Sequence, residues 1–158
     1  MKMVLETALL TSQEPLKATE LTFRWPAAHG ASMIRGVVTA DYDAIIRLVV
    51  IGSRGQRERI EAVVDTGFDG WLSLPLSMIR DLELPWFRRG RASLGDGSES
   101  LFNIYRGSLV WDGKRRKVVI DACDTTPLVG MRMLAGWELN LPVQQKSRFV
   151  IRKLQKSL

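Results

Sequence analysis

Short runs of apolar, β-branched residues separated by turn residues constrain the fold of this 158-residue chain more than any other feature. The clearest run spans 45–51 and is followed by Ser53-Arg54-Gly55-Gln56, which is a typical turn sequence. Residues 57–64 resume the strand pattern, so the two runs predict a hairpin. The chain has 13 Gly and six Pro and no long pattern with a period of 3.6 residues. The sequence therefore predicts an all-β fold with many turns.

The same reasoning assigns the remaining elements. Pro75 suits the first turn of a helix, which we expect to end before Leu84-Pro85. Gly95-Asp96-Gly97-Ser98 predicts the turn of a second hairpin. The expected strands are 34–40, 71–74, 91–94, 99–111, 117–122, 128–130 and 138–143, and the expected short helices are 75–82 and 131–135.

Length and composition indicate one folded domain, because 46% hydrophobic residues are enough to fill a single core. Residues 1–32 differ from the rest and predict an N-terminal extension, either a loosely attached arm or the product of an upstream start codon. We expect the domain itself to span 33–145. Residues 146–158 are interpreted as a basic C-terminal tail.

The residue content of the chain argues against several classes of function. Cys123 is the only cysteine, so no disulfide within the chain is possible and a cytoplasmic location is expected. No apolar stretch approaches the roughly 20 residues of a membrane span, which predicts no membrane insertion. His29 is the only histidine and has no Cys or His companions at ligand spacing, so we expect no metal and no cofactor.

The charge balance raises nucleic acid as a partner, since 23 Lys and Arg against 17 Asp and Glu give a net charge of +6. The basic residues are dispersed, however, and no zinc-finger, RNP or helix-turn-helix pattern accompanies them. A solvated or adhesive basic surface is the preferred interpretation, and a nucleic-acid partner is unlikely.

Asp65-Thr66-Gly67 is the motif that carries chemistry. It follows the apolar strand residues Val63 and Val64, so the strand ends on a carboxylate. There the carboxylate can be held by hydrogen bonds, the Thr hydroxyl can bond to backbone, and Gly allows another backbone segment to approach. The ordinary alternative is a loop aspartate that caps backbone amides.

A second motif, Leu128-Val129-Gly130, follows about 60 residues later and precedes a predicted short helix. Together the two motifs make the chain resemble the retropepsin-like aspartic proteases over about residues 33 to 143. The resemblance implies a small closed β-barrel with one or two short helices. It also implies an aspartic endopeptidase in which Asp65, Thr66 and Gly67 form the catalytic loop. Asp69 matches an acidic position of the family, although Met131 precedes Arg132 here where many members place Arg directly after the second Gly.

The resemblance also suggests which residues contact a peptide substrate. A hairpin lies between the two motifs, where the family keeps a flap that covers the substrate. The expected substrate-binding residues are Phe68, Asp69, Gly95, Asp96, Gly97 and Val129.

The chemistry requires two carboxylates that share one proton, and the chain supplies one Asp-Thr-Gly motif. Asp124-Thr125-Thr126 lacks the Gly and is interpreted as a turn. We therefore expect a homodimer whose partner contributes its own Asp65 and which hydrolyses peptide bonds through an activated water. A catalytically silent dimerisation or binding module with a basic surface is the alternative.

Overall fold

The computed structural model describes residues 33–93 and 99–155, which form ten strands and two short helices. The strands are β1 (Met33–Val38), β2 (Ala44–Ile51), β3 (Arg57–Val64), β4 (Leu72–Leu74), β5 (Trp86–Ser93), β6 (Glu99–Trp111), β7 (Lys114–Ala122), β8 (Leu128–Val129), β9 (Trp137–Asn140) and β10 (Arg148–Lys153). The helices are α1 (Leu76–Asp81) and α2 (Met131–Leu134). The prediction of an all-β fold with two short helices is confirmed.

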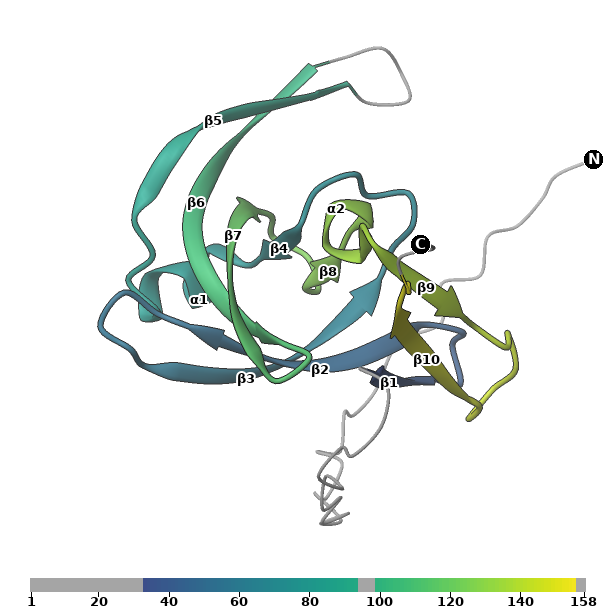
Figure 1. Ribbon diagram of the computed structural model, residues 1–158. Coiled ribbons are helices and arrows are strands. Elements are labelled where there is room, and N and C mark those ends of the chain that lie inside the picture. The colour runs from purple at the N-terminus through teal and green to yellow at the C-terminus, as the bar shows by residue number, and fades with distance from the viewer. Residues whose placement is uncertain (1–32, 94–98, 156–158) are drawn as a thin grey trace, which may run out of the picture.

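The strands belong to one sheet in the order β5-β6-β7-β4-β8-β3-β2-β1-β10-β9, and β2 also pairs with β6. Because of that extra pairing, β6, β7, β4, β8, β3 and β2 form a ring of paired strands. Figure 1 shows the β5–β6 hairpin extending from this ring as a long curved arm.

Alternation along the strands produces the core. In β2 the side chains of Ile46, Leu48 and Val50 are buried, whereas Arg47 between them is exposed and pairs with Glu61 on β3. This is the expected pattern for a strand with one face packed inward. The largest fully buried side chains are Phe149, Ile46, Leu72, Leu74, Ile79, Leu109, Ile120, Met133, Ile151, Val38, Val50 and Val129.

The second hairpin is longer than the sequence indicated. β5 begins at Trp86 rather than at residue 91, and its pairing with β6 runs from Trp86 opposite Tyr105 to Ser93 opposite Glu99. The register shifts between Trp86 and Arg88, so a β-bulge interrupts the ladder at the base of the arm. Gly95, Asp96 and Gly97, which we predicted to form the tip, lie outside the described residues.

The end of the domain requires a correction. Residues 146–158 were interpreted as a tail, but Arg148–Lys153 forms β10, which pairs with both β1 and β9. Phe149 and Ile151 from this strand are buried in the core. The folded domain therefore extends beyond residue 145. No helix within 33–93 and 99–155 has the length and apolar character needed to cross a membrane.

Candidate active site

Asp65 is the first residue after β3, and hydrogen bonds hold it at both backbone and side chain. Its N–H donates to the carbonyl of Val129 at 2.9 Å, and its Oδ1 accepts from the N–H of Gly67 at 2.8 Å. A Cβ on Gly67 would lie 3.2 Å from the same Oδ1. A side chain at residue 67 would therefore crowd the carboxylate, which explains the small residue there. The Asp65 side chain is half-buried, and Thr66 and Gly67 are exposed.

The two motifs predicted to act together are in direct contact. β8 pairs in parallel with β3, with Val63 opposite Leu128 and Val64 opposite Val129. On its other side β8 pairs antiparallel with β4. The short second motif is thus inserted beside the Asp65 loop, and this position explains the backbone bond from Asp65 to Val129.

The helix after the second motif fixes the rest of the loop. The N–H of Met131 donates to the carbonyl of Phe68 at 2.8 Å, and the N–H of Arg132 donates to that of Gly70 at 3.1 Å. Nε of Arg132 also donates to the main-chain carbonyl of Asp69 at 3.1 Å. The Arg that follows the second Gly therefore contacts the backbone of Asp69, and the Asp69 side chain is exposed.

Gly130 lies where these segments cross. A Cβ on this residue would lie 2.6 Å from the carbonyl oxygen of Phe68 and nearer still to that of Gly70. Its N–H donates to the carbonyl of Trp71 at 3.1 Å. Only glycine leaves room for the loop and β8 to pass so closely.

Two of the expected substrate-binding residues, Phe68 and Val129, differ in how deeply they are buried. Phe68 is half-buried, and its ring lies against both Gly70 and Gly130. Val129 is fully buried in the core, so its predicted contact with a substrate is corrected. Its neighbour Leu128 is half-buried and points to the opposite face of the strand, which makes Leu128 the better candidate.

A row of paired residues connects the Asp65 loop to the β5–β6 arm. Each residue in the row lies opposite the next across adjacent strands, and cross-strand partners have their side chains on the same face of the sheet. The row runs Val63, Leu128, Ser73, Asp121, Ile104, Arg88. Val63 precedes Asp65 by two residues, so the alternation of β3, continued one residue past its end, assigns the Asp65 side chain to this face.

Asp121 is the only carboxylate in this row, and the sequence did not single it out. Burial raises the pKa of its carboxyl above the ordinary value; Arg88 acts in the opposite direction, Asp69 adds to the rise, and Arg132 lowers it. A Cβ on Gly70 would lie 3.1 Å from Oδ2 of Asp121, so this carboxylate approaches the loop that carries Asp65.

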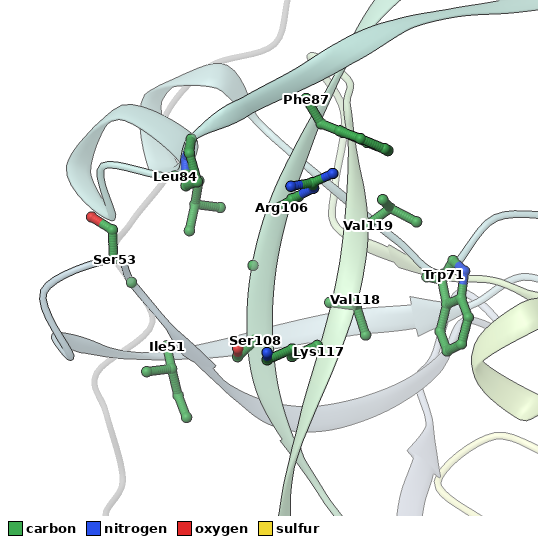
Figure 2. A pocket seen from close by; sticks show the side chains of 13 residues that line it. Ile51, Ser53, Trp71, Leu84, Phe87, Arg106, Ser108, Lys117, Val118 and Val119 are labelled. Atoms are coloured by element: carbon green, nitrogen blue, oxygen red, sulfur yellow. The ribbon is translucent and has the colours of Figure 1, made fainter.

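A cavity of about 700 Å³ lies away from the Asp65 loop, against β6 and β7 (Figure 2). The guanidinium of Arg106 lies 4.0 Å from the centre of the Phe87 ring in its wall. Trp71 forms another part of the wall, and the guanidinium carbon of Arg116 lies 4.7 Å from the centre of its ring. Among the described residues predicted for the site, Asp65, Thr66, Gly67, Phe68, Asp69 and Val129, none lines this cavity.

Other candidate residues fall into ordinary structural roles. Asp124, Thr125 and Thr126 form an exposed bend, and the Cys123 thiol is 3.0 Å from the Thr125 hydroxyl. Trp111 and Trp137 pack edge to face with 5.7 Å between ring centroids. Within the described ranges, no group of three or more His, Cys, Asp or Glu side chains is arranged to hold a metal ion.

Comparison with known proteins bears on the fold. No family model and no curated protein matches the chain. It is similar to the crystal structure of a retropepsin-like aspartic protease from Rickettsia conorii, with a TM-score of 0.52 and 16% identity over 82% of this chain and 97% of that chain. It is also similar to the foamy viral protease-reverse transcriptase in complex with an RNA/DNA hybrid, with a TM-score of 0.46 and 10% identity over 65% of this chain and 13% of that chain.

The fold of the chain is therefore retropepsin-like. The fold that the two motifs implied is confirmed by this similarity and by the arrangement of β3, β8 and α2 around the Asp65 loop.

Proposed function

We propose that the chain is one protomer of a homodimeric aspartic endopeptidase in which two Asp65 carboxylates activate a water to hydrolyse peptide bonds. The observation that carries this proposal is the way Asp65 is held at the end of β3. Its backbone is bonded to Val129 of the second motif, and its carboxylate accepts from Gly67 within the first. A carboxylate held in this way is positioned before a substrate arrives.

The reaction needs one group to accept a proton from water and another to donate one to the scissile amide. Two carboxylates within hydrogen-bonding reach can do both, because like charges so close together cannot both ionise and the pair retains one proton. One chain supplies a single Asp-Thr-Gly loop, so the second carboxylate comes from a second copy. An isologous two-fold interface places each Asp65 opposite its own copy when the axis passes beside this loop.

The surface around the loop supports such an assembly. Thr66 and Gly67 are exposed at its tip. Met131, whose N–H bonds to the same loop, is 48% exposed although it is a large apolar residue. A second copy seated on this surface would cover Met131, and covering exposed apolar area stabilises association.

The substrate is proposed to be an extended peptide segment of a protein. Phe68 and Leu128 are half-buried beside Asp65 and offer apolar contacts. Asp69 is exposed and available to the substrate backbone. The β5–β6 arm would cover the peptide. The contacts expected from Gly95, Asp96 and Gly97 lie outside the described residues and stay a prediction.

A binding module without catalytic activity is the second candidate, and the basic surface favours it. Arg88, Arg89, Arg91 and Arg106 lie on the β5–β6 arm and are exposed. Such an arm could hold an acidic partner through charge alone. This candidate predicts association without peptide hydrolysis.

Digestion of a peptide library by the wild type and by the Asp65→Asn variant separates the two candidates. The Asn side chain can still accept the Gly67 hydrogen bond through its oxygen but cannot act as a general base. We expect cleavage by the wild type and none by Asp65→Asn, with unchanged melting temperatures. Asp81→Asn, which makes the same change at an exposed position on α1, serves as the control and should cleave normally. Equal peptidase activity in wild type and Asp65→Asn would refute the assignment.

A further inference from the structure

Asp121 lies on the same face of the sheet as Asp65, at a distance that a bound peptide can span. Its row contains Ser73 on one side and Ile104 on the other, with Arg88 at the far end. β7 is three strands from β3, and neighbouring strands are about 4.8 Å apart, so the row places Asp121 roughly 14 Å from Val63 along the sheet. An extended peptide advances about 3.3 Å per residue, so this separation corresponds to a few residues.

The Asp121 carboxylate has no hydrogen bond or ion pair with any other side chain or backbone group of the described residues. Two polar neighbours have hydrogen bonds elsewhere. The Ser73 hydroxyl accepts from the N–H of Leu128 at 3.1 Å, and Nε of Arg132 donates to the carbonyl of Asp69, which leaves the Ser73 O–H and the other Arg132 N–H groups as donors. A half-buried carboxylate without a partner gains more from a cationic ligand than an exposed one does.

The aromatic ring of Phe68 lies near this carboxylate, beside Gly70. The ring of Phe68 and Oδ2 of Asp121 both approach the point where a Cβ of residue 70 would lie, with Oδ2 at 3.1 Å from it. A ligand side chain arriving here therefore meets an aromatic surface and a carboxylate together. Lys and Arg match this combination, because each has an aliphatic stem and a charged end.

The other charged groups that face Asp121 are Asp69 on the loop, Arg132 on α2 and Arg88 on β5. Arg132 uses Nε for the Asp69 carbonyl, and both Arg88 and Arg132 lower the pKa of the Asp121 carboxyl. Arg88 is exposed on the arm, beyond Ile104 in the row. Asp69 adds a second negative charge on the side of the loop and raises that pKa.

We propose that Asp121 is a specificity-determining residue that selects a Lys or Arg side chain a few residues from the scissile bond, with the Phe68 ring packing on the stem of that side chain. This inference rests on the proposed function for its substrate, an extended peptide. It adds the class of side chain that the site prefers and the residue that recognises it.

The test measures binding and cleavage separately. Octapeptides carrying Lys, norleucine or Glu at each position in turn are bound to the full chain with Asp65→Asn, which holds peptides without cleaving them, and are digested by the wild type. We expect at least a tenfold preference for Lys over norleucine at one position. Adding Asp121→Asn should reduce that preference below threefold, and Asp121→Leu should reverse it in favour of norleucine. Asp124→Asn, which alters an exposed carboxylate on the following bend, should leave it unchanged.

The outcomes distinguish this inference from the proposed function. A Lys preference that persists in Asp121→Asn, or the absence of any Lys preference, overturns the inference. A preference for Glu that disappears in Arg88→Met overturns it as well, because the arm would then select the opposite charge. Lys-selective binding that depends on Asp121, in a wild type that cleaves no peptide, would support the inference and reject the peptidase. Circular dichroism confirms that each variant is folded.

Discussion

Replacing Gly130 with Ala tests how closely the second motif passes the Asp65 loop. The added Cβ would lie 2.6 Å from the carbonyl oxygen of Phe68, and such contacts are essentially never found below 3.0 Å, so that carbonyl must retreat by about 0.4 Å. The Gly70 carbonyl must move further. These two carbonyls accept the backbone bonds of Met131 and Arg132 that attach α2 to the loop. The substitution therefore weakens the contacts that hold the loop in place.

The cost can be estimated from these contacts. Overpacking a tight site costs about 1–3 kcal/mol, and each of two weakened backbone bonds adds about 0.5–1.5 kcal/mol. Gly130 has an ordinary φ of −98°, so strain in the backbone dihedrals adds nothing. We expect a loss of about 2–6 kcal/mol in the free energy of unfolding and a fall of about 10 °C in Tm.

Thermal and urea unfolding of the purified protein measure this loss. Gly113→Ala makes the same chemical change in the turn between β6 and β7, where φ is +73° and no atom lies within 4 Å of the new Cβ. Its cost is limited to backbone strain of about 1–2 kcal/mol. If Gly130→Ala melts at the wild-type temperature, or if Gly113→Ala is the more damaging of the two, the close crossing at Gly130 is refuted.

Three further predictions concern stability and assembly. The folded state binds the Asp121 proton more tightly than the unfolded chain, so this carboxyl costs stability increasingly as pH rises from its unfolded pKa through its raised folded pKa. Asp121→Asn should therefore gain Tm relative to wild type as the pH rises above about 4, the ordinary pKa of an aspartate, and a difference that stays constant with pH would contradict the effect of burial. Arg116→Met removes the bond to the Met133 carbonyl at 3.0 Å and the stacking on Trp71. It should cost about 1–2 kcal/mol in urea unfolding, with partial recovery in Arg116→Lys; an unchanged midpoint would show that these contacts contribute nothing. Specific activity should fall on dilution as dimers dissociate, whereas a value that stays constant where sedimentation detects only monomer would exclude a composite site.

The sequence predicted the features that depend on local pattern. The alternation in 57–64 and the turn before it specified β3, so the position of Asp65 at a strand end followed directly. The strands expected at 99–111 and 117–122 likewise correspond to β6 and β7, which pair as a hairpin. These features depend on neighbours in the chain, which the sequence displays.

Features that depend on pairing between distant strands were missed. Asp121 belongs to the same face as Asp65 only because Ser73, on a strand between them, pairs with both Leu128 and Asp121. The choice of Val129 instead of Leu128 as a pocket residue has the same origin, since two adjacent apolar residues do not reveal which of them faces the core.

The strand β10 was missed for a different reason. Arg148 and Arg152 flank a short apolar segment, and because of these charges we interpreted the segment as part of a basic tail. Phe149 and Ile151 are buried because β1 and β9 provide pairing on both sides, which no local pattern indicates.

Mixing the wild type with the Asp65→Asn variant tests whether one active site contains an Asp65 from each of two chains. Wild-type protein at a fixed concentration is equilibrated with increasing amounts of the variant, and peptide hydrolysis is measured, with serum albumin added instead of the variant as the control. Random pairing leaves about half of the wild-type protomers in wild-type dimers at equal amounts and about one tenth at a ninefold excess. If the active site is shared, hydrolysis falls to about those fractions. Hydrolysis that stays at its starting value at a ninefold excess of Asp65→Asn would contradict a shared active site.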